Sequence, residues 1–233
     1  VDELNNINNA NKRKPLITFD DMVIGIDFMS VQKAYPIRWL NVHEIINDEI
    51  LNTPIAVTWH WPSGSVNVFD RNINNKTIEL GNTGLVANGN LLMFDRSNKK
   101  AKENFAFVGL ISQWKEEFIS GPESGQKIKT VPFKFVPWEI WKEKHPKTLI
   151  LKPVKTLQKR YKKMNPKPYF LSDEVMFDIQ EKLPEDGINK KDFIVRIDNG
   201  KIQKLFSLEN MSKNNQKYLY KISNIFKNND FKF

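Results

Sequence analysis

The chain has 233 residues, a length that fits one large domain or two small ones, and 40% of them are hydrophobic, which is enough for a packed core and excludes a wholly disordered chain. It has no cysteine, which excludes disulfides, zinc–thiolate clusters and cysteine nucleophiles, and no apolar run reaches the roughly 18 residues of a membrane-spanning helix. The formal net charge of +9 comes from one stretch, Lys142–Lys167, because its ten basic residues face one acid and the remaining charges balance.

Short strands separated by turns make up most of the predicted structure. Segment 1–20, rich in Asn and Lys at its start, is predicted to be a mobile arm. Runs of apolar and β-branched residues predict strands at 22–27, 32–36, 54–60, 65–70, 76–80, 91–94 and 148–151. Segment 37–48 fits a helical turn followed by a strand, and 137–144 fits a helix because Pro137 suits its first turn. The sequence therefore predicts a mainly β (α+β) fold of antiparallel strand–turn–strand units with a few short helices.

An internal similarity links the first hairpin to the C-terminal part of the chain. Ile26–Ile37 aligns without a gap with Ile197–Leu208, and the two share Ile-Asp, Gln-Lys, an aromatic residue and a branched aliphatic residue. Both are predicted to be hairpins, related by an internal repeat or alike by chance. The main β-rich domain is expected at 21–151 and a basic connecting segment at 152–168. A C-terminal part at 169–233 is expected to carry the second hairpin and to pack on the main domain.

Several blocks of residues, in a fixed order, resemble one known family. Among them are Val23–Ile26, Lys33–Ile37, Pro54–Thr58, Asn90–Arg96 and Tyr169–Phe177. Over about 21–208 the chain is similar to domain-of-unknown-function family 3179. Members of that family often begin with signal peptides or lipoprotein segments, so the resemblance implies an exported or cell-envelope location. No signal or anchor segment is visible in this chain.

The chain departs from that family at one motif. Where the family usually has Thr-Tyr-Cys-Pro-Leu-Cys-Gly, this chain has Thr-Trp-His-Trp-Pro-Ser-Gly at 58–64, so that His60 and Ser63 stand where the two cysteines would be. The paired thiols imply a redox or soft-metal role in the family, and thiol chemistry is excluded here. A site with changed ligands and a lost site both remain open.

A transition-metal site, for Cu or Zn, is one candidate. His43 and His60 both lie in blocks that match the family, and both are expected at strand ends facing one pocket. Further ligands would come from Glu44, Asp48, Asp70 or Met93. The alternative is that each histidine is a hydrogen-bonded structural residue.

A pocket for a small polar ligand is the second candidate. Trp59 and Trp61 flank His60 and are predicted to share one face of a strand, as an aromatic wall. Polar residues in the matching blocks would contact the ligand, namely Ser63, Asn88, Asn90, Ser112 and Gln113. Buried amides at such positions also close the backbone hydrogen bonds of tight turns. A serine nucleophile at Ser63 is disfavoured, because the Gly-x-Ser-x-Gly pattern is absent.

The function predicted from these features is binding of a small ligand or metal at a His43/His60 site in an exported protein. The alternative is a non-catalytic interaction or structural module, with a protein partner, that has lost the thiol site, and an enzyme of unknown reaction is a further alternative. Residues 69–71 and 94–96 both read Phe-Asp-Arg and predict hairpin ends with structural ion pairs. The basic stretch is predicted to be a solvated surface or a contact for an anionic membrane. Nucleic acid is disfavoured, because Lys outnumbers Arg thirty to six, as codon bias would produce.

Overall fold

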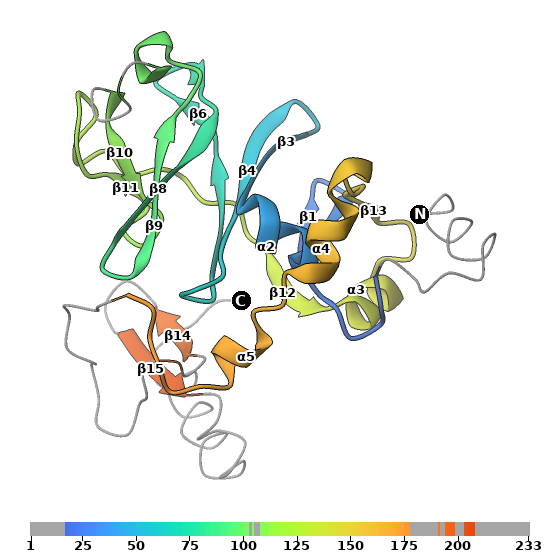
Figure 1. The fold of residues 1–233 in the computed structure, drawn as a ribbon. Coiled ribbons are helices and arrows are strands. Elements are labelled where there is room, and N and C mark those ends of the chain that lie inside the picture. Colours follow the sequence, from blue (N-terminus) through green and yellow to red (C-terminus); the bar gives the residue numbers. More distant parts are fainter. Residues whose placement is uncertain are drawn as a thin grey trace. The chain divides into compact units, whose positions relative to one another are not determined.

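The computed structural model describes residues 17–102, 104, 108–177, 191, 194–198 and 203–207. The chain forms two compact units, Val1–Tyr169 and Phe170–Phe233, and each is described by itself. Strands dominate, most of them antiparallel, and the helices are short, which confirms the predicted fold class (Figure 1). The predicted arm lies almost wholly outside the described residues. No helix in the described part of the chain is long and apolar enough to cross a membrane.

The first sheet of the first unit has the strand order β12-β1-β2-β13. Its strands are β1 (Met22–Phe28), β2 (Val31–Pro36), β12 (Lys134–Pro137) and β13 (Leu149–Ile150), and only β13 is parallel to its neighbour. Helix α3 (Trp138–Lys144), which confirms the helix predicted after Pro137, packs Trp141 on this sheet. A Cβ at Gly25 would overlap the Trp141 ring, so the close approach of helix and sheet requires glycine there.

The second sheet has the order β3-β4-β5 and follows helix α2 (Ile37–His43). Its strands are β3 (Ile45–Ile50), β4 (Thr53–His60) and β5 (Ser65–Asp70), all antiparallel. Segment 37–48 is thus a helix followed by a strand, and the two are separated by Glu44 at φ 57°. Strand β4 is buried on both faces, which is why its sequence is apolar without alternation.

The third sheet has the order β11-β10-β9-β8 and packs on the second. Its strands are β8 (Leu80–Ala87), β9 (Asn90–Asp95), β10 (Leu110–Ser112) and β11 (Glu117–Phe118), and a small ribbon of β6 (Asn72–Ile73) and β7 (Lys76–Thr77) precedes them. Ala56 and Phe69 of the second sheet share a core with Leu91, Met93 and Ile111 of the third. One face of the β3–β4–β5 sheet therefore looks toward β9 and β10 (Figure 1).

The predicted connecting segment belongs to the first unit. It contains one 3₁₀ turn, η3 (Lys155–Leu157), and helix α4 (Gln158–Lys163). Helix α5 (Lys167–Phe170) follows. Another 3₁₀ turn, η1 (Lys99–Lys102), lies earlier in the chain, after β9. Helix α4 rests on α2 through the buried Tyr161, whose ring centroid lies 6.4 Å from that of Trp39. The basic stretch is therefore anchored by one aromatic residue.

The second unit contains the hairpin of β14 (Ile194–Asp198) and β15 (Gln203–Ser207). Ile197 pairs with Lys204 in this hairpin as Ile26 pairs with Lys33 in the first, so the two share one register. Both predicted hairpins are present. Their origin as an internal repeat stays a prediction, because Leu208 and the side chains of β14 and β15 lie outside the described residues.

Candidate functional site

A cluster of polar side chains lies where β4 and β5 meet the third sheet. His60 and Ser65 form the last pair of the β4–β5 ladder, and Gly64, at φ 63°, closes the turn between them. Because side chains alternate along a strand, His60 points to the same face as Ala56, which packs on the third sheet. The side chains that meet there are called the His60 cluster below: His60, Ser63, Ser65, Asn90 and Gln113.

The hydrogen bonds of the His60 cluster run in one direction. Asn90 Oδ1 accepts from the Leu91 N–H at 2.8 Å, so the Ser65 hydroxyl, 3.1 Å away, must donate to it. Ser65 has then used its proton, so the one proton of Ser63 is shared between Ser65 Oγ at 2.7 Å and the backbone oxygen of His60 at 3.3 Å. Ser63 Oγ lies 2.7 Å from His60 Nδ1 and can only accept there. His60 is therefore protonated on Nδ1, and Nε2 carries the lone pair.

This arrangement limits the chemistry of His60 and Ser63. His60 is 4% exposed, and its burial lowers the pKa of the imidazole to about 4, so the ring is neutral at pH 7. A serine nucleophile needs a histidine that takes the hydroxyl proton, whereas here Nδ1 donates to the hydroxyl. The pair is therefore arranged as a fixed hydrogen-bond relay and not as a nucleophile with its base.

Gln113, the residue directly after β10, closes the cluster and is 2% exposed. Its Nε2 donates to the backbone oxygen of Ser65 at 3.1 Å and to Ser65 Oγ at 3.2 Å. A carbonyl oxygen can only accept, so the nitrogen faces Ser65 and Oε1 faces away. Oε1 is buried and has no hydrogen-bond partner among the described residues. Leaving such an acceptor unsatisfied costs about 1–3 kcal/mol, which a bound group with a donor would recover.

The two predicted wall tryptophans have separate partners. Trp59 points to the opposite face of β4 from His60, where Nε1 donates to Asn41 of α2 at 2.8 Å and the ring stacks on Phe135 at 5.8 Å. Trp61 lies in the β4–β5 turn and meets Tyr169 edge-on, with centroids 5.6 Å apart. Each ring thus packs against another aromatic residue of the first unit.

Two other predicted ligand residues stabilise turns. Asn88, at φ 49°, precedes Gly89 in the β8–β9 hairpin turn, a position that favours asparagine. Ser112 is 3% exposed, and its hydroxyl accepts from the Lys115 N–H at 3.1 Å. The structure therefore brings Ser63, Asn90 and Gln113 to His60 and places the other predicted ligand residues elsewhere.

His43 has a different environment. Its Nε2 lies 2.7 Å from the hydroxyl of Tyr161, which also accepts from the Val154 N–H at 3.2 Å. Burial, and after it the charge of Arg160, lower the pKa of His43. Helix α2, which carries His43, contacts the Trp59 face of β4, whereas His60 points to the other face. Each imidazole therefore has its own partner.

The further metal ligands proposed for His43 and His60 are engaged in other contacts. Asp48 accepts from Lys33 and from the Tyr35 hydroxyl, and Glu44 accepts from Asn82. Asp70 accepts from a backbone N–H, and Met93 lies in the core. No group of three or more His, Asp or Glu side chains in the described part of the chain could hold a metal ion. The shared metal site stays a prediction, without a third ligand among these residues.

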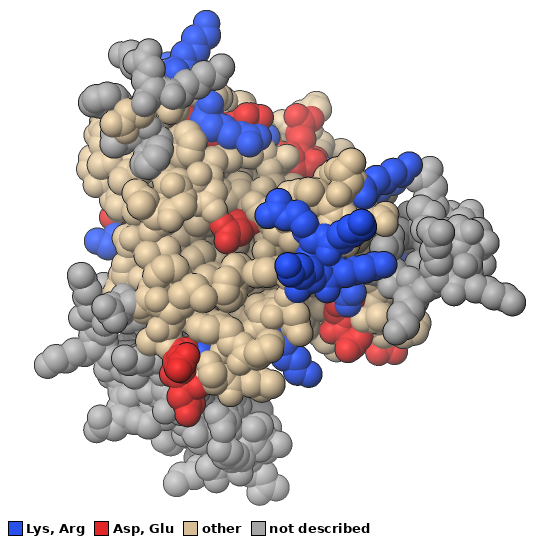
Figure 2. All heavy atoms as spheres, viewed as in Figure 1, with Lys and Arg blue, Asp and Glu red and all other residues tan. Residues whose placement is uncertain are grey.

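Five basic residues of η3 and α4 form a group of exposed charges, called the α4 patch below: Lys155, Lys159, Arg160, Lys162 and Lys163. All five are exposed, and none forms an ion pair with another described residue. Lysine and arginine side chains gather over α4 in Figure 2. The predicted exposure of the basic stretch is present at this helix.

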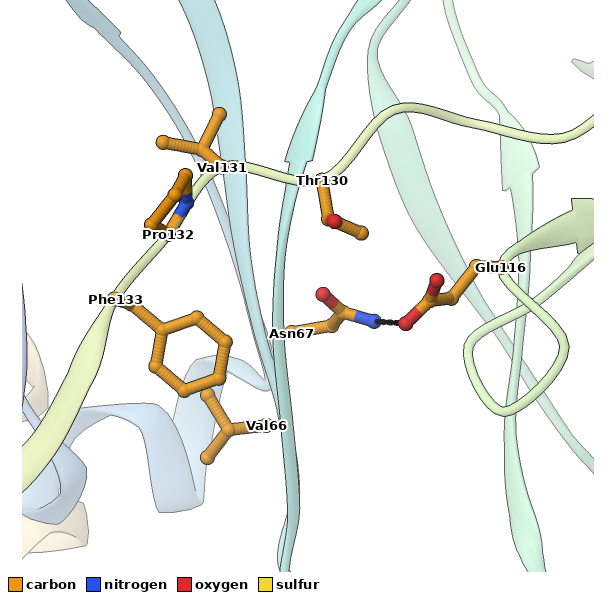
Figure 3. Close-up of a pocket in the computed structure, with 7 residues that line it drawn as sticks. All are labelled: Val66, Asn67, Glu116, Thr130, Val131, Pro132 and Phe133. Carbon is orange, nitrogen blue, oxygen red and sulfur yellow. Dashed lines mark hydrogen bonds between the residues drawn. The ribbon is translucent and has the colours of Figure 1, made fainter. Parts of the chain in front are cut away.

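Sequence reasoning missed Ser65, which connects every other part of the His60 cluster. A signal was available, because Ser65 and Asn67 alternate with Val66 and Val68 along β5, so a polar face of this strand could be read from its sequence. The same reasoning missed Glu116, which lies with Asn67 at a cavity beside β5 (Figure 3).

Comparison with known proteins gives one match. A family model described as "Protein of unknown function (DUF3179)" matches residues 3–222. The chain therefore belongs to this family, as the resemblance predicted. No curated protein and no solved structure matches it.

Proposed function

We propose that this chain is a small-ligand-binding protein of the cell envelope and that the His60 cluster holds its ligand. The observation that carries this proposal is Gln113 Oε1, a buried acceptor with no partner among the described residues, next to a relay whose hydrogen bonds are otherwise directed and complete. Ser63, at one end of the relay, is exposed, so a ligand would approach from that side. The envelope location is supported by the family's frequent signal peptides.

The cluster favours an uncharged ligand that carries hydrogen-bond donors. It consists of two hydroxyls, two amides and an imidazole that is neutral at pH 7, so it offers no charge to compensate a buried ion. Gln113 Oε1 is a buried acceptor with no partner among the described residues, and only a group that carries a donor can satisfy it. A small amide or alcohol is the class that matches these groups.

A metal ion is the second candidate, and one feature favours it. A metal-binding histidine usually has its other ring N–H held by a hydrogen bond, as Ser63 holds Nδ1–H of His60 here. Isothermal titration with Zn²⁺ and with Cu²⁺ tests this candidate. Uptake of one ion that the His60→Ala substitution abolishes would favour the metal over the uncharged ligand.

The decisive experiment uses acetamide as a small neutral probe. We expect acetamide to shift the NMR signals of the Gln113 side-chain amide in the unmodified protein. The Gln113→Met substitution, which keeps the side-chain length but removes the acceptor, should abolish acetamide binding. Gln32→Met, on the first sheet, is the matched control and should bind as the unmodified protein does.

Two results would contradict the proposal. A high-resolution crystal structure grown with acetamide could show a single water molecule at Gln113 Oε1, which would identify the site as a hydration site. Fractionation of the native cells tests the location separately, and recovery of the protein in the cytosol alone would overturn the envelope assignment without touching the site.

A further inference from the structure

The outer edge of β5 is paired over only part of its length. The Val131 N–H donates to the oxygen of Val68 at 2.8 Å, and the Asp70 N–H donates to the oxygen of Lys129 at 2.8 Å. The backbone groups of Val68 and Asp70 thus point away from β4. Because this direction alternates along a strand, Val66 presents its N–H and C=O to the same outer side.

The pairing stops before it reaches Val66. Because backbone direction alternates along a strand, the next bond of the ladder would run from the Phe133 N–H to the Val66 oxygen, and no such bond forms between these two described residues. The Val68 N–H is satisfied locally, by Asn67 Oδ1 at 2.9 Å. No hydrogen bond joins the backbone of Val66 to any other segment in the part of the chain that the structure describes. The edge is therefore open at one residue, next to a paired stretch that fixes its geometry.

A cavity of about 370 Å³ lies in front of this open edge. Figure 3 shows Val66 and Phe133 on one side of it and Asn67 with Glu116 on the other. The cavity thus has an apolar wall and a wall that carries a carboxylate, with the backbone of β5 between them.

Glu116 is held in place by its own backbone and by Asn67. Its N–H donates to the oxygen of Ser112 at 2.9 Å, its oxygen accepts from Ile128 at 2.8 Å, and its φ of 55° is a conformation that non-glycine residues rarely adopt. Asn67 Nδ2 donates to Oε1 of the carboxylate at 2.9 Å.

Glu116 and its neighbour Glu117 differ in their ion pairing. It has no ion pair with another described residue, whereas the next residue, Glu117, pairs with Lys127 at 2.9 Å. A fixed carboxylate with no ion pair among the described residues matches a cationic side chain that reaches its side of β5.

We propose that the β5 edge at Val66 binds an extended peptide by strand addition, and that a lysine or arginine side chain of this peptide enters the cavity and pairs with Glu116. The backbone of Val66 would supply the hydrogen bonds, and the cavity would supply the preference for a basic residue. This binding surface is separate from the His60 cluster and does not depend on a ligand there.

The test uses acetyl-Thr-Val-Lys-Val-Thr-amide and the same peptide with norleucine in place of lysine. We expect the lysine peptide to bind the full chain at least about tenfold more tightly in isothermal titration, because a charge-assisted bond of this kind contributes about 1.5–3 kcal/mol. The Glu116→Gln substitution should remove the difference between the two peptides. Glu79→Gln, which changes an exposed acid paired with Arg96, is the matched control and should keep it.

Strand addition has a second signature on the peptide. Two variants of the lysine peptide are compared, one methylated on the backbone nitrogen of the lysine and one on that of the valine before it. Their affinities should differ, because adjacent N–H groups point to opposite sides of a strand. One of the two methylated peptides should lose binding and the other should keep it, and this readout does not depend on the folding of any variant.

Three results would overturn the proposal. The first is absence of binding of the lysine peptide at millimolar concentration, and the second is binding of this peptide to the Glu116→Gln variant as tight as to the unmodified protein. Binding of n-butylammonium as tight as that of the peptide would identify a site for small cations instead of strand addition.

Discussion

The two histidines of the predicted metal pair lie in contrasting regions. His60 belongs to a neutral cluster between two sheets, where Asn90, at the other end of the relay, sets the direction of its hydrogen bonds. His43 lies at the end of a short helix, beside a tyrosine and a basic helix, where Arg160 acts on its pKa. Burial lowers the pKa of both histidines, so the direction of the pKa shift alone does not distinguish the environment of His60 from that of His43. The two histidines are distinguished by the face of β4 on which they lie: His60 points toward the third sheet, and the helix that carries His43 contacts the opposite face.

The largest expected difference between the histidines is in acid. Unfolded His60 takes up a proton near its ordinary pKa of about 6.5, and the folded residue does so only near 4. The unfolded state therefore holds more protons in this window, so stability rises with pH and is lost as the pH falls from about 6.5 to 4, by up to about 3 kcal/mol.

Urea unfolding across this pH range measures the effect. The His60→Gln substitution should flatten the pH dependence, and His43→Gln should remove a smaller part of it. An equal reduction by both substitutions would break the contrast between the two environments.

Truncation at neutral pH should sharpen the same contrast. His60→Ala leaves a cavity and takes the donor from Ser63, so it should lower the free energy of unfolding by about 2 kcal/mol. His43→Ala, at a half-buried position, should cost about 1 kcal/mol. Denaturant midpoints with unchanged slopes would measure both, and a larger loss at His43 would contradict the expected order.

The third expected effect concerns the partner of His43. Tyr161→Phe keeps the ring against Trp39 but removes the hydroxyl from His43 and from the Val154 N–H, which should cost about 1 kcal/mol. A double-mutant cycle with His43→Ala should show non-additive losses. Strict additivity would mean that the 2.7 Å contact contributes nothing to stability.

The smallest expected effect on stability is at the α4 patch. Replacing Lys159, Arg160, Lys162 and Lys163 with glutamine should change the free energy of unfolding by less than about 0.5 kcal/mol, because these charges are exposed and unpaired. Arg160→Gln alone should raise the pKa of His43, which NMR titration measures, and should leave His60 unchanged.

The α4 patch also carries the membrane alternative. Sedimentation with phosphatidylglycerol vesicles at low salt tests it, and binding should fall steeply as salt is added and vanish in the fourfold variant. Absence of binding by the unmodified protein at low salt would identify a solvated surface.

Local sequence predicted β1, β2, β4, β5, β9 and β13, the first hairpin, α3 and the family, because these depend on periodicity, turn residues and ordered motifs. Strands β10, β11 and β12 were not predicted, and β8 extends from Leu80 to Ala87, beyond the strand predicted at 76–80. It could not distinguish the two Phe-Asp-Arg segments. Arg96 forms the predicted ion pair, with Glu79 at 3.1 Å. The prediction was wrong for Arg71, which is 8% exposed and donates to the backbone oxygens of Ile55, Ile78 and Asp48.

The reason is tertiary. A guanidinium has five donors in a fixed fork, and three chain segments happen to bring carbonyl oxygens to it. No tripeptide contains that information. The same holds for the His60 cluster, whose parts come from three strands and two turns.

Arg71 gives β4 a property that its sequence does not reveal. One end of the strand is held at Ile55 by the Arg71 guanidinium, and the other end carries His60, whose pKa is lowered by burial to about 4. The contacts at the start of β4 therefore do not depend on His60, whereas those at its end are lost when His60 takes up a proton. In mild acid β4 should unfold locally, starting at the β4–β5 turn. Amide hydrogen exchange should therefore rise first near His60 and last near Ile55.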